Sequence, residues 1–512
     1  MNLERRVARM IVGDVRLQGE RDPGAERDRI LREVGELGIG GVVFFGGLST
    51  DVRSLIDQLT RAAGAPLIAA ADLERGAGQQ FGGATVLPTA MAIGATGIPD
   101  LAFAAGSATA AEARTVGINT VLAPVADLAS EPSNPIVGTR SFGSVADRAG
   151  EFVAAFVRGC QEVGAAATVK HFPGHGATIT DSHIELPKVG AGRAALESRE
   201  LVPFRAAIDA GVRAVMTAHV AYEALDPGVP ASLSRAVTTG VLRDELGFDG
   251  LVMTDALVME GACGAADPVV ASFAAGADVL LMPRDVGAAI GSLSAAVRSG
   301  RISEARIEES LARIDVFHAW LEGRSVAAPV AKPADVAEEI AAAAVTLVRE
   351  GVGPIGPSDD SFRCVVVADT RRPVDIEPLR EELGVLAPGV SVKVVRGGDR
   401  ASVPEVPPAS RTIVFVIDEI AAWRGFAGLS EPGRGLLIEI VRGAEASDGS
   451  GAIVVALGTP IRPEALPEGC GLVWAYDASP ASQRAALRVV FGLTRPNGRP
   501  PFDLPEAQRL PG

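Results

Sequence analysis

The sequence lacks the features that mark several common classes of protein. Its formal net charge is −15, and no long basic block occurs. Nucleic acids and anionic membrane surfaces both need a basic footprint, so neither is an expected partner. No run of about twenty apolar residues is present, so no membrane-spanning helix is predicted. At 47% hydrophobic and 22% charged residues, the composition instead predicts globular domains with sizeable cores.

Cysteine is scarce, and the few that occur are widely separated. Cys160, Cys263, Cys364 and Cys470 lie about a hundred residues apart, without any CxxC pair. This spacing favours buried free thiols over a disulfide framework or a zinc ribbon. The N-terminal stretch MNLERRVARMIVGDVRLQG also lacks the apolar core of a signal peptide, because arginines and acids run through it. We therefore expect a soluble, cytoplasmic protein.

The first part of the chain, up to about residue 325, alternates β-branched runs with longer alanine-rich stretches, as βα units do. Eight apolar runs can be counted, at residues 8–14, 39–45, 66–72, 118–127, 166–171, 212–219, 249–255 and 277–283. Eight strands in this length predict a TIM-like (β/α)8 barrel rather than an open doubly wound sheet. Polar residues end or follow several runs: Asp72, Asp127, Lys170, His171, His219, Asp255 and Arg284. Because the carboxyl ends of barrel strands open on one face, we expect these residues to surround an active site.

A second domain is predicted from a change in composition. The Pro/Ala/Val-rich stretch at 323–336 is typical of a linker. We expect a barrel domain over 1–325, a linker over 326–340 and a smaller α/β sandwich domain over 341–512. Five further apolar runs between residues 363 and 478 make a five-stranded sheet the simplest arrangement of that domain. It has no GxGxxG after its first strand and no P-loop, so nucleotide binding has little support.

Histidine is also scarce, yet three of the five histidines lie in KHFPGHGATITDSH, residues 170–183. Pro173, Gly174 and Gly176 break any helix there, which predicts a loop after the fifth strand. Asp181 stands two residues before His183, and a carboxylate that holds one imidazole nitrogen raises the basicity of the other. The pair therefore suits a proton shuttle. A metal site and a purely structural loop are the alternatives; zinc ligands usually have a more regular spacing than these.

Asp255 supplies the reaction partner that a proton shuttle needs. It ends the seventh run after wholly apolar residues, so we expect it at the barrel mouth, as a nucleophile or electrostatic stabiliser. The alternative is a helix N-cap at a βα turn. Polar groups that could bind sugar hydroxyls are Asp72, Arg140 in VGTRSFG, Lys170 and His171. Asp127 and His219 could shape the same pocket or be structural.

The motifs KHFPGHGATITDSHIELP, VGTRSFG and MTDALVM together resemble glycoside hydrolase family 3, specifically its β-N-acetylhexosaminidase branch. The resemblance spans most of residues 1–325 in motif order. It implies that Asp255 is the nucleophile and that His183, oriented by Asp181, is the general acid and then the general base. Asp72, Arg140, Lys170 and His171 match sugar-binding positions, and no metal or organic cofactor is implied. The segment DLERGAG departs from the branch's usual DQEGGRV, and Ala256 stands where a second acid often occurs; both departures bear on substrate preference.

The function predicted from residues and resemblance together is a retaining, exo-acting β-N-acetylglucosaminidase that acts on small glycosides such as cell-wall fragments. A β-N-acetylglucosaminide phosphorylase of the same family is one alternative, because an imidazole acid/base is compatible with incoming phosphate as well as water. A β-glucosidase of the family is another, because the DLERGAG segment is altered. A non-catalytic sugar-binding barrel has no use for a nucleophile and a shuttle together. The expected partner is a small glycoside, and a homodimer is possible.

Overall fold

The computed structural model describes residues 1–19, 21–182, 184–262, 266–351, 353, 362–370, 373–396, 411–418, 424, 426–446 and 451–503. The chain divides into two compact units. The first comprises Met1–Val86, Ala102–Glu131 and Ala146–Pro333. The second comprises Leu87–Leu101, Pro132–Val145 and Ala334–Gly512.

The first unit is built on an eight-stranded parallel sheet with the order β10-β1-β2-β3-β4-β5-β7-β9. Its strands are β1 (Ile11–Arg16), β2 (Gly41–Phe45), β3 (Ile68–Ala71), β4 (Thr120–Val121), β5 (Ala166–Phe172), β7 (Ala214–Thr217), β9 (Leu251–Thr254) and β10 (Leu280–Leu281). The two edge strands meet through a parallel bridge between Met253 and Val279, which closes the sheet. The predicted (β/α)8 barrel is confirmed, and each predicted run overlaps one of these strands.

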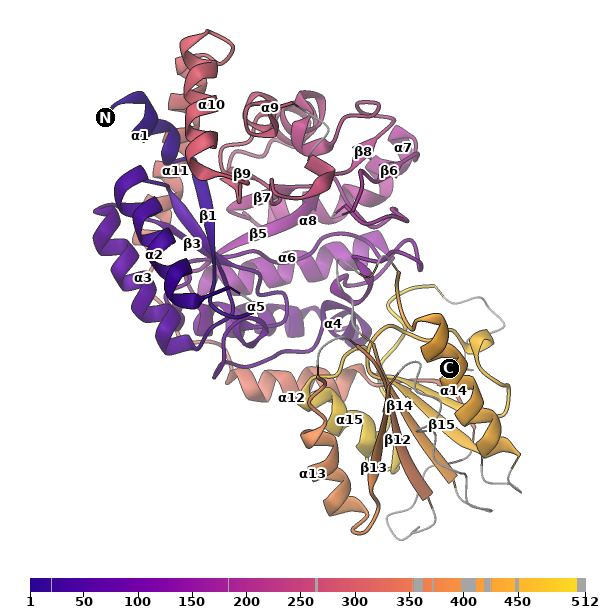
Figure 1. Cartoon of the computed structure of the whole chain (residues 1–512). Helices are drawn as coiled ribbons and strands as arrows, with labels where there is room; N and C mark the ends of the chain where they lie inside the picture. Colours follow the sequence, from indigo (N-terminus) through magenta and orange to yellow (C-terminus); the bar gives the residue numbers. More distant parts are fainter. Residues whose placement is uncertain are drawn as a thin grey trace. The chain divides into compact units, whose positions relative to one another are not determined.

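Helices cover the outside of this sheet (Figure 1). They are α1 (Leu3–Ala8), α2 (Pro23–Arg32), α3 (Ser49–Ala63), α5 (Pro99–Val116), α6 (Ala146–Glu162), α8 (Val202–Asp209), α9 (Pro268–Ala275), α10 (Val286–Arg298) and α11 (Glu304–Glu322). In α3, for example, Val52, Leu55, Ile56 and Leu59 are buried at helical spacing. Local sequence also fixes where helices begin, since the side chain of Asp285 accepts a hydrogen bond from the first turn of α10.

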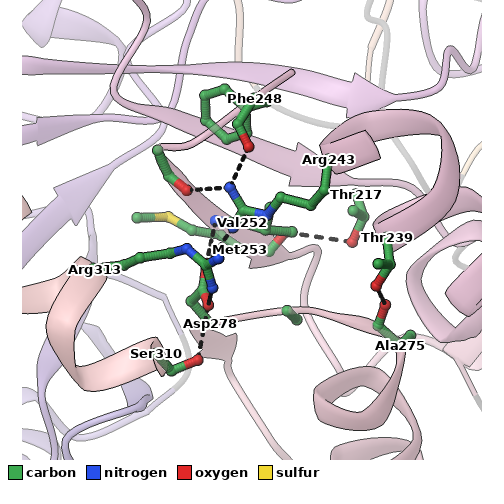
Figure 2. A network of polar contacts seen from close by, with 12 residues as sticks. Thr217, Thr239, Arg243, Phe248, Val252, Met253, Ala275, Asp278, Ser310 and Arg313 are labelled. Carbon is green, nitrogen blue, oxygen red and sulfur yellow. Dashed lines mark hydrogen bonds and ion pairs between the residues drawn. The ribbon is translucent and has the colours of Figure 1, made fainter. Parts of the chain in front are cut away.

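A buried polar network surrounds Asp278, just before β10 at the amino-terminal end of the barrel strands (Figure 2). The Asp278 carboxylate accepts hydrogen bonds from Arg243 at 2.6 Å and from the Ser310 hydroxyl at 2.7 Å. Arg313 of α11 donates to the same carboxylate at 3.2 Å, and Val252 N of β9 donates at 3.1 Å. This network ties α11 to the strands at one end of the barrel. In TIM-like barrels the active site lies at the opposite end, where the carboxyl ends of the strands meet.

The second unit holds a six-stranded sheet with the order β11-β16-β15-β14-β12-β13. Its strands are β11 (Thr346–Arg349), β12 (Phe362–Asp369), β13 (Val392–Arg396), β14 (Arg411–Asp418), β15 (Ala452–Ala456) and β16 (Gly471–Trp474). Its helices include α12 (Pro333–Ala344), α13 (Glu377–Leu386), α14 (Glu431–Glu445) and α15 (Pro480–Val490). The five predicted strands are present, but the expected strand number was wrong. The additional β11 pairs antiparallel with β16, and its four residues follow an alanine-rich helix too closely to stand out.

Two segments from the first half of the chain belong to the second unit. One carries α4 (Ala90–Thr96), and Thr89 N beside it donates to Asp477 at 2.7 Å. The other includes Ser144, whose N–H donates to the Pro501 carbonyl at 3.0 Å. The proposed boundaries at 326–340 stay a prediction, and α12 begins within that range.

Two predictions from composition can be compared with the described residues. Cys160, Cys364 and Cys470 are buried free thiols, as predicted, whereas Cys263 lies outside the described residues. No described helix is both long and apolar enough to cross a bilayer.

Candidate active site

The predicted sugar-binding residues Asp72 and Lys170 meet at the carboxyl ends of β3 and β5. The Lys170 ammonium lies 2.5 Å from Asp72 Oδ1 and 2.7 Å from Glu74 Oε1, and only 2% of Lys170 is exposed. The pairing of β5 with β7 shifts register between Val169 and Phe172. Such an irregularity re-aims side chains, here at the two positions that carry Lys170 and His171.

Asp127, just beyond β4, is the centre of the next group of contacts. Its carboxylate accepts a hydrogen bond from His171 Nδ1 at 2.7 Å and from His175 N at 2.6 Å. Burial by itself would raise the pKa of Asp127, but the neighbouring His171 and His175 together outweigh it and the pKa is lowered. An ionised Asp127 therefore fixes the ring of His171 and the backbone of the loop at the same time.

His175 is a structural residue of the loop. The Thr178 hydroxyl donates to the His175 carbonyl at 3.0 Å, so His175 Nδ1 donates in turn to that hydroxyl at 2.8 Å. Nε2 then accepts from the Ser182 hydroxyl at 3.0 Å. Burial lowers the pKa of His175 to about 4, although the charges of Asp127 and Asp255 oppose the shift. With both ring nitrogens engaged and the ring neutral, His175 serves neither as a proton shuttle nor as a metal ligand.

The start of the loop packs tightly against the barrel. A Cβ atom on Gly176 would lie 1.8 Å from the Leu128 carbonyl oxygen, so only glycine fits there. The Tyr222 hydroxyl donates a hydrogen bond to the Gly174 carbonyl. Gly174 itself has a φ of 130°, which other residues rarely adopt. These contacts hold the first half of the loop in place.

The end of the loop lies against the segment that follows Asp255. The Ser182 carbonyl accepts a hydrogen bond from Gly261 N at 3.0 Å, and Gly261 belongs to a short turn, η7 (Glu260–Ala262). A Cβ atom on Gly261 would lie 2.8 Å from the same carbonyl oxygen. Asp181, 2% exposed, lies directly before Ser182. His183 follows Ser182 and lies outside the described residues, so its pairing with Asp181 stays a prediction.

Asp255 is held at the end of β9 by its neighbours. Its N–H donates to the Thr217 carbonyl at 3.1 Å, and its carboxylate accepts from Ala256 N at 2.7 Å. His219 Nε2 donates to the Ala256 carbonyl at 3.2 Å, while His219 Nδ1 accepts from the Ser232 hydroxyl at 2.6 Å. Fully buried His219 therefore fixes the turn on which Asp255 stands.

Arg140 is the remaining predicted sugar-binding residue. It ends the turn η3 (Gly138–Arg140), and its guanidinium donates to the Ile136 carbonyl at 3.2 Å. Both residues belong to the second unit, so a role for Arg140 toward the sugar stays a prediction.

Several supporting residues were missed from the sequence. Glu74, the third residue of DLERGAG, was not predicted as an ion-pair partner of Lys170. Thr178 and Ser182 gave no signal, because a small hydroxyl in a loop is common. The close approach of Gly261 to Ser182 joins distant segments and has no local signature.

Several titratable groups thus gather at the carboxyl ends of four barrel strands. Two pairs, Asp72 with Lys170 and Asp127 with His171, provide hydrogen-bond acceptors and donors in fixed positions. Asp255 provides a separate carboxylate, which is held by the backbone of its own turn. Among the described residues, no group of His, Cys, Asp and Glu is arranged to hold a metal ion. A TIM-like barrel with such a mouth is typical of a glycoside hydrolase.

Comparison with known proteins assigns the family. The model of the glycosyl hydrolase family 3 N-terminal domain matches residues 3–316. The chain belongs to glycosyl hydrolase family 3, as its motifs predicted. A solved family 3 β-N-acetylglucosaminidase from Paenibacillus sp. str. FPU-7 is 31% identical, with a TM-score of 0.87 over 98% of this chain and 99% of that one.

Two curated relatives are similar over part of the chain. A β-N-acetylglucosaminidase/β-glucosidase of Cellulomonas fimi is 33% identical over 65% of this chain. The match spans 63% of the Cellulomonas protein, which is less than two thirds of its length. A β-hexosaminidase of Tolumonas auensis is 37% identical over 52% of this chain and 82% of its own length. These relatives agree with the β-N-acetylhexosaminidase branch that the motifs resemble.

Proposed function

We propose that this glycoside hydrolase is a retaining, exo-acting β-N-acetylglucosaminidase that acts on small glycosides, including cell-wall-derived fragments. The observation that carries the proposal is the hydrogen bond between the Ser182 carbonyl and Gly261 N, at 3.0 Å. It brings the segment that ends in Asp181 and Ser182 against the segment that follows Asp255. The names of the Paenibacillus and Tolumonas relatives support the same sugar.

In the proposed reaction, the Asp255 carboxylate attacks the anomeric carbon, and the bond to the leaving oxygen breaks. His183 protonates that oxygen as it leaves, with Asp181 orienting the imidazole. The product of this step is a glycosyl ester of Asp255. His183, now neutral, then takes a proton from water as the water attacks the anomeric carbon and releases Asp255. Two inversions at one carbon retain the configuration.

The glycone is held in this proposal by Asp72, Arg140, Lys170 and His171. Lys170 neutralises part of the charge on Asp72 and Glu74, so that Asp72 still has acceptor capacity for sugar hydroxyls. His171 donates through Nδ1 to Asp127, which leaves Nε2 as the ring nitrogen for a sugar hydroxyl. Fixed groups of this kind bind without reorganisation when the sugar arrives.

A β-glucosidase is the second candidate, favoured by one observation. The Cellulomonas fimi relative carries both activities in its name, and the segment DLERGAG departs from the branch's usual sequence between Asp72 and Gly78. A change beside the residue that would bind sugar hydroxyls is where a different sugar preference is expected.

The test is hydrolysis of nitrophenyl β-N-acetylglucosaminide and nitrophenyl β-glucoside, compared side by side with and without inorganic phosphate. The proposal expects faster turnover of the N-acetylglucosaminide, no stimulation by phosphate and free sugar as the product. Faster turnover of the glucoside would support the second candidate. Sugar 1-phosphate as the main product would make the protein a phosphorylase, and no turnover of either glycoside would overturn the proposal.

A further inference from the structure

The loop that carries Asp181 has an inverted pattern of burial. Its polar residues are buried: Thr178 is 0% exposed, and Asp181 and Ser182 are each 2% exposed. Its aliphatic residues are not, because Ile179 is 67% exposed and Ile184 is 57% exposed. In a folded protein the informative departures are buried polar groups and exposed large apolar ones, and this loop combines both. The buried polar groups build the site, so the exposed isoleucines need a separate explanation.

A third exposed aliphatic residue lies on the segment that faces this loop. Val258 is 42% exposed, while its neighbours Leu257 and Met259 are buried at 2% and 6%. Val258 lies between Asp255 and Gly261, and Gly261 N donates to the Ser182 carbonyl. The segments that carry Ile184 and Val258 are therefore joined by a hydrogen bond close to both residues.

Exposed aliphatic side chains contribute little to the stability of the fold, and single ones are common on any surface. Three of them on the two segments that bear the proposed acid and nucleophile are a local concentration. Apolar surface gathered beside polar groups marks a place where a ligand is bound. The question is which part of the substrate covers it.

The proposed reaction identifies the part of the substrate that covers this apolar surface. A general acid must reach the glycosidic oxygen, and this oxygen departs with the leaving group. Ile184 directly follows His183 in sequence, and Ile179 lies two residues before Asp181, so both flank the proposed acid. The hydroxyl-binding groups Asp72 and Lys170 lie at the carboxyl ends of β3 and β5, before this loop begins. The isoleucines thus belong to the leaving-group side of the site.

We propose that Ile179, Ile184 and Val258 form an aglycone site that strengthens the binding of glycosides whose leaving group carries apolar surface. This inference rests on the proposed function, because it takes the acid from the Asp181–His183 pair. The three side chains lose contact with water when an alkyl or aryl aglycone binds, and the loop gains apolar contacts across the bound substrate. A strongly polar aglycone gains no such contact.

The test uses a series of methyl, butyl and octyl β-N-acetylglucosaminides with the full-length protein. In the wild type, kcat/KM should rise about tenfold from the methyl to the octyl glycoside, as burial of a few methylene groups provides. The paired substitution Ile179→Ser with Ile184→Ser should flatten this dependence on chain length, while kcat/KM for the methyl glycoside changes less than about twofold. Val258→Ser tests the facing segment by itself, in case the loop of the paired variant is disturbed.

Val316→Ser is the matched control, because Val316 is also 67% exposed but lies on α11. It should keep the dependence on chain length of the wild type. Two results would overturn the aglycone site and leave the proposed function standing. One is wild-type turnover that does not depend on chain length, and the other is a dependence on chain length that persists in both the paired variant and Val258→Ser. Absence of turnover with every glycoside of the series would overturn the proposed function, and the aglycone site with it.

Discussion

At the scale of single residues, the site consists of polar groups that are held by protein partners before any substrate binds. Lys170 is almost fully buried, and its ion pairs with Asp72 and Glu74 offset the cost of removing an ammonium group from water. A hydrogen bond from His171 Nδ1 holds the buried Asp127 carboxylate. The geometry of these groups is therefore set by the fold, and a sugar meets donors and acceptors that need not rearrange.

Asp255→Asn should abolish turnover while the fold is kept. An amide cannot attack the anomeric carbon, and the side chain keeps an oxygen that accepts from Ala256 N. We expect kcat for the nitrophenyl N-acetylglucosaminide to fall at least about a thousandfold, with an unchanged thermal midpoint. Mass spectrometry of the wild type, quenched during turnover, should find the glycosyl group on the peptide that contains Asp255. A label on another carboxylate would contradict the assignment.

His183→Ala should affect substrates according to their leaving groups. Protonation matters most for alkoxide leaving groups, while nitrophenolate departs without it. We expect kcat/KM to fall by about a hundredfold or more for alkyl glycosides and far less for nitrophenyl glycosides. His175→Asn is the comparison, because His175 is structural and its loss should affect both kinds of substrate alike. Equal losses in the His183 variant would remove His183 from the role of acid.

Residue types at strand ends made part of this site predictable. Asp72, Lys170 and Asp255 lie at or near the ends of apolar runs, and the structure places them at the carboxyl ends of β3, β5 and β9. Asp127 ends a run too, but it lies six residues after β4. The sequence could not separate His175 from the other histidines, because its structural role depends on burial and on two hydroxyl partners. Nor could it show that Glu74 shares Lys170 with Asp72, since that requires the approach of β3 and β5 residues.

At the scale of elements, the loop after β5 is fixed by close backbone approaches rather than by secondary structure. Gly176 lies against the Leu128 carbonyl, and Gly261 lies against the Ser182 carbonyl. Such approaches are set by tertiary packing, so the sequence predicted a loop there but not its path. The barrel strands were predictable because each is a continuous apolar run, whereas β11 was not, because its four residues pair only through tertiary structure.

Gly176→Ala should displace this loop. The added methyl group would lie 1.8 Å from the Leu128 carbonyl oxygen, and backbone on both sides must move to accept it. We expect a loss of about 1 to 3 kcal/mol in the free energy of unfolding and a reduced kcat. Gly190→Ala is the matched control, because its Cβ atom would meet nothing within 4 Å. Denaturant unfolding and initial rates measured on both variants check the prediction, and two variants that behave alike would contradict it.

At the scale of the whole molecule, the two units are not consecutive along the chain, since two segments between barrel elements belong to the second unit. The stability of the barrel unit is therefore best followed by a residue that lies wholly within it. His318 on α11 is such a residue, 8% exposed and near Arg9 and Asp315. It has no part in the proposed chemistry.

Burial, aided by Arg9, lowers the pKa of His318 to about 4, against an ordinary value near 6.5 in the unfolded chain. Between these values the unfolded chain binds the proton and the folded protein does not. The stability contributed by the neutral ring is therefore complete above about pH 6.5 and is lost as the pH falls toward 4. His318→Gln removes this titration, so the free energy of unfolding of the variant should fall less than that of the wild type as the pH is lowered. Relative to the wild type, its free energy of unfolding should improve by about 2 to 3 kcal/mol from pH 7.5 to pH 4.5. Denaturant unfolding of both proteins at the two pH values measures this difference. If the two proteins differed in free energy of unfolding by the same amount at both pH values, the folded protein would bind a proton at His318 as readily as the unfolded chain does.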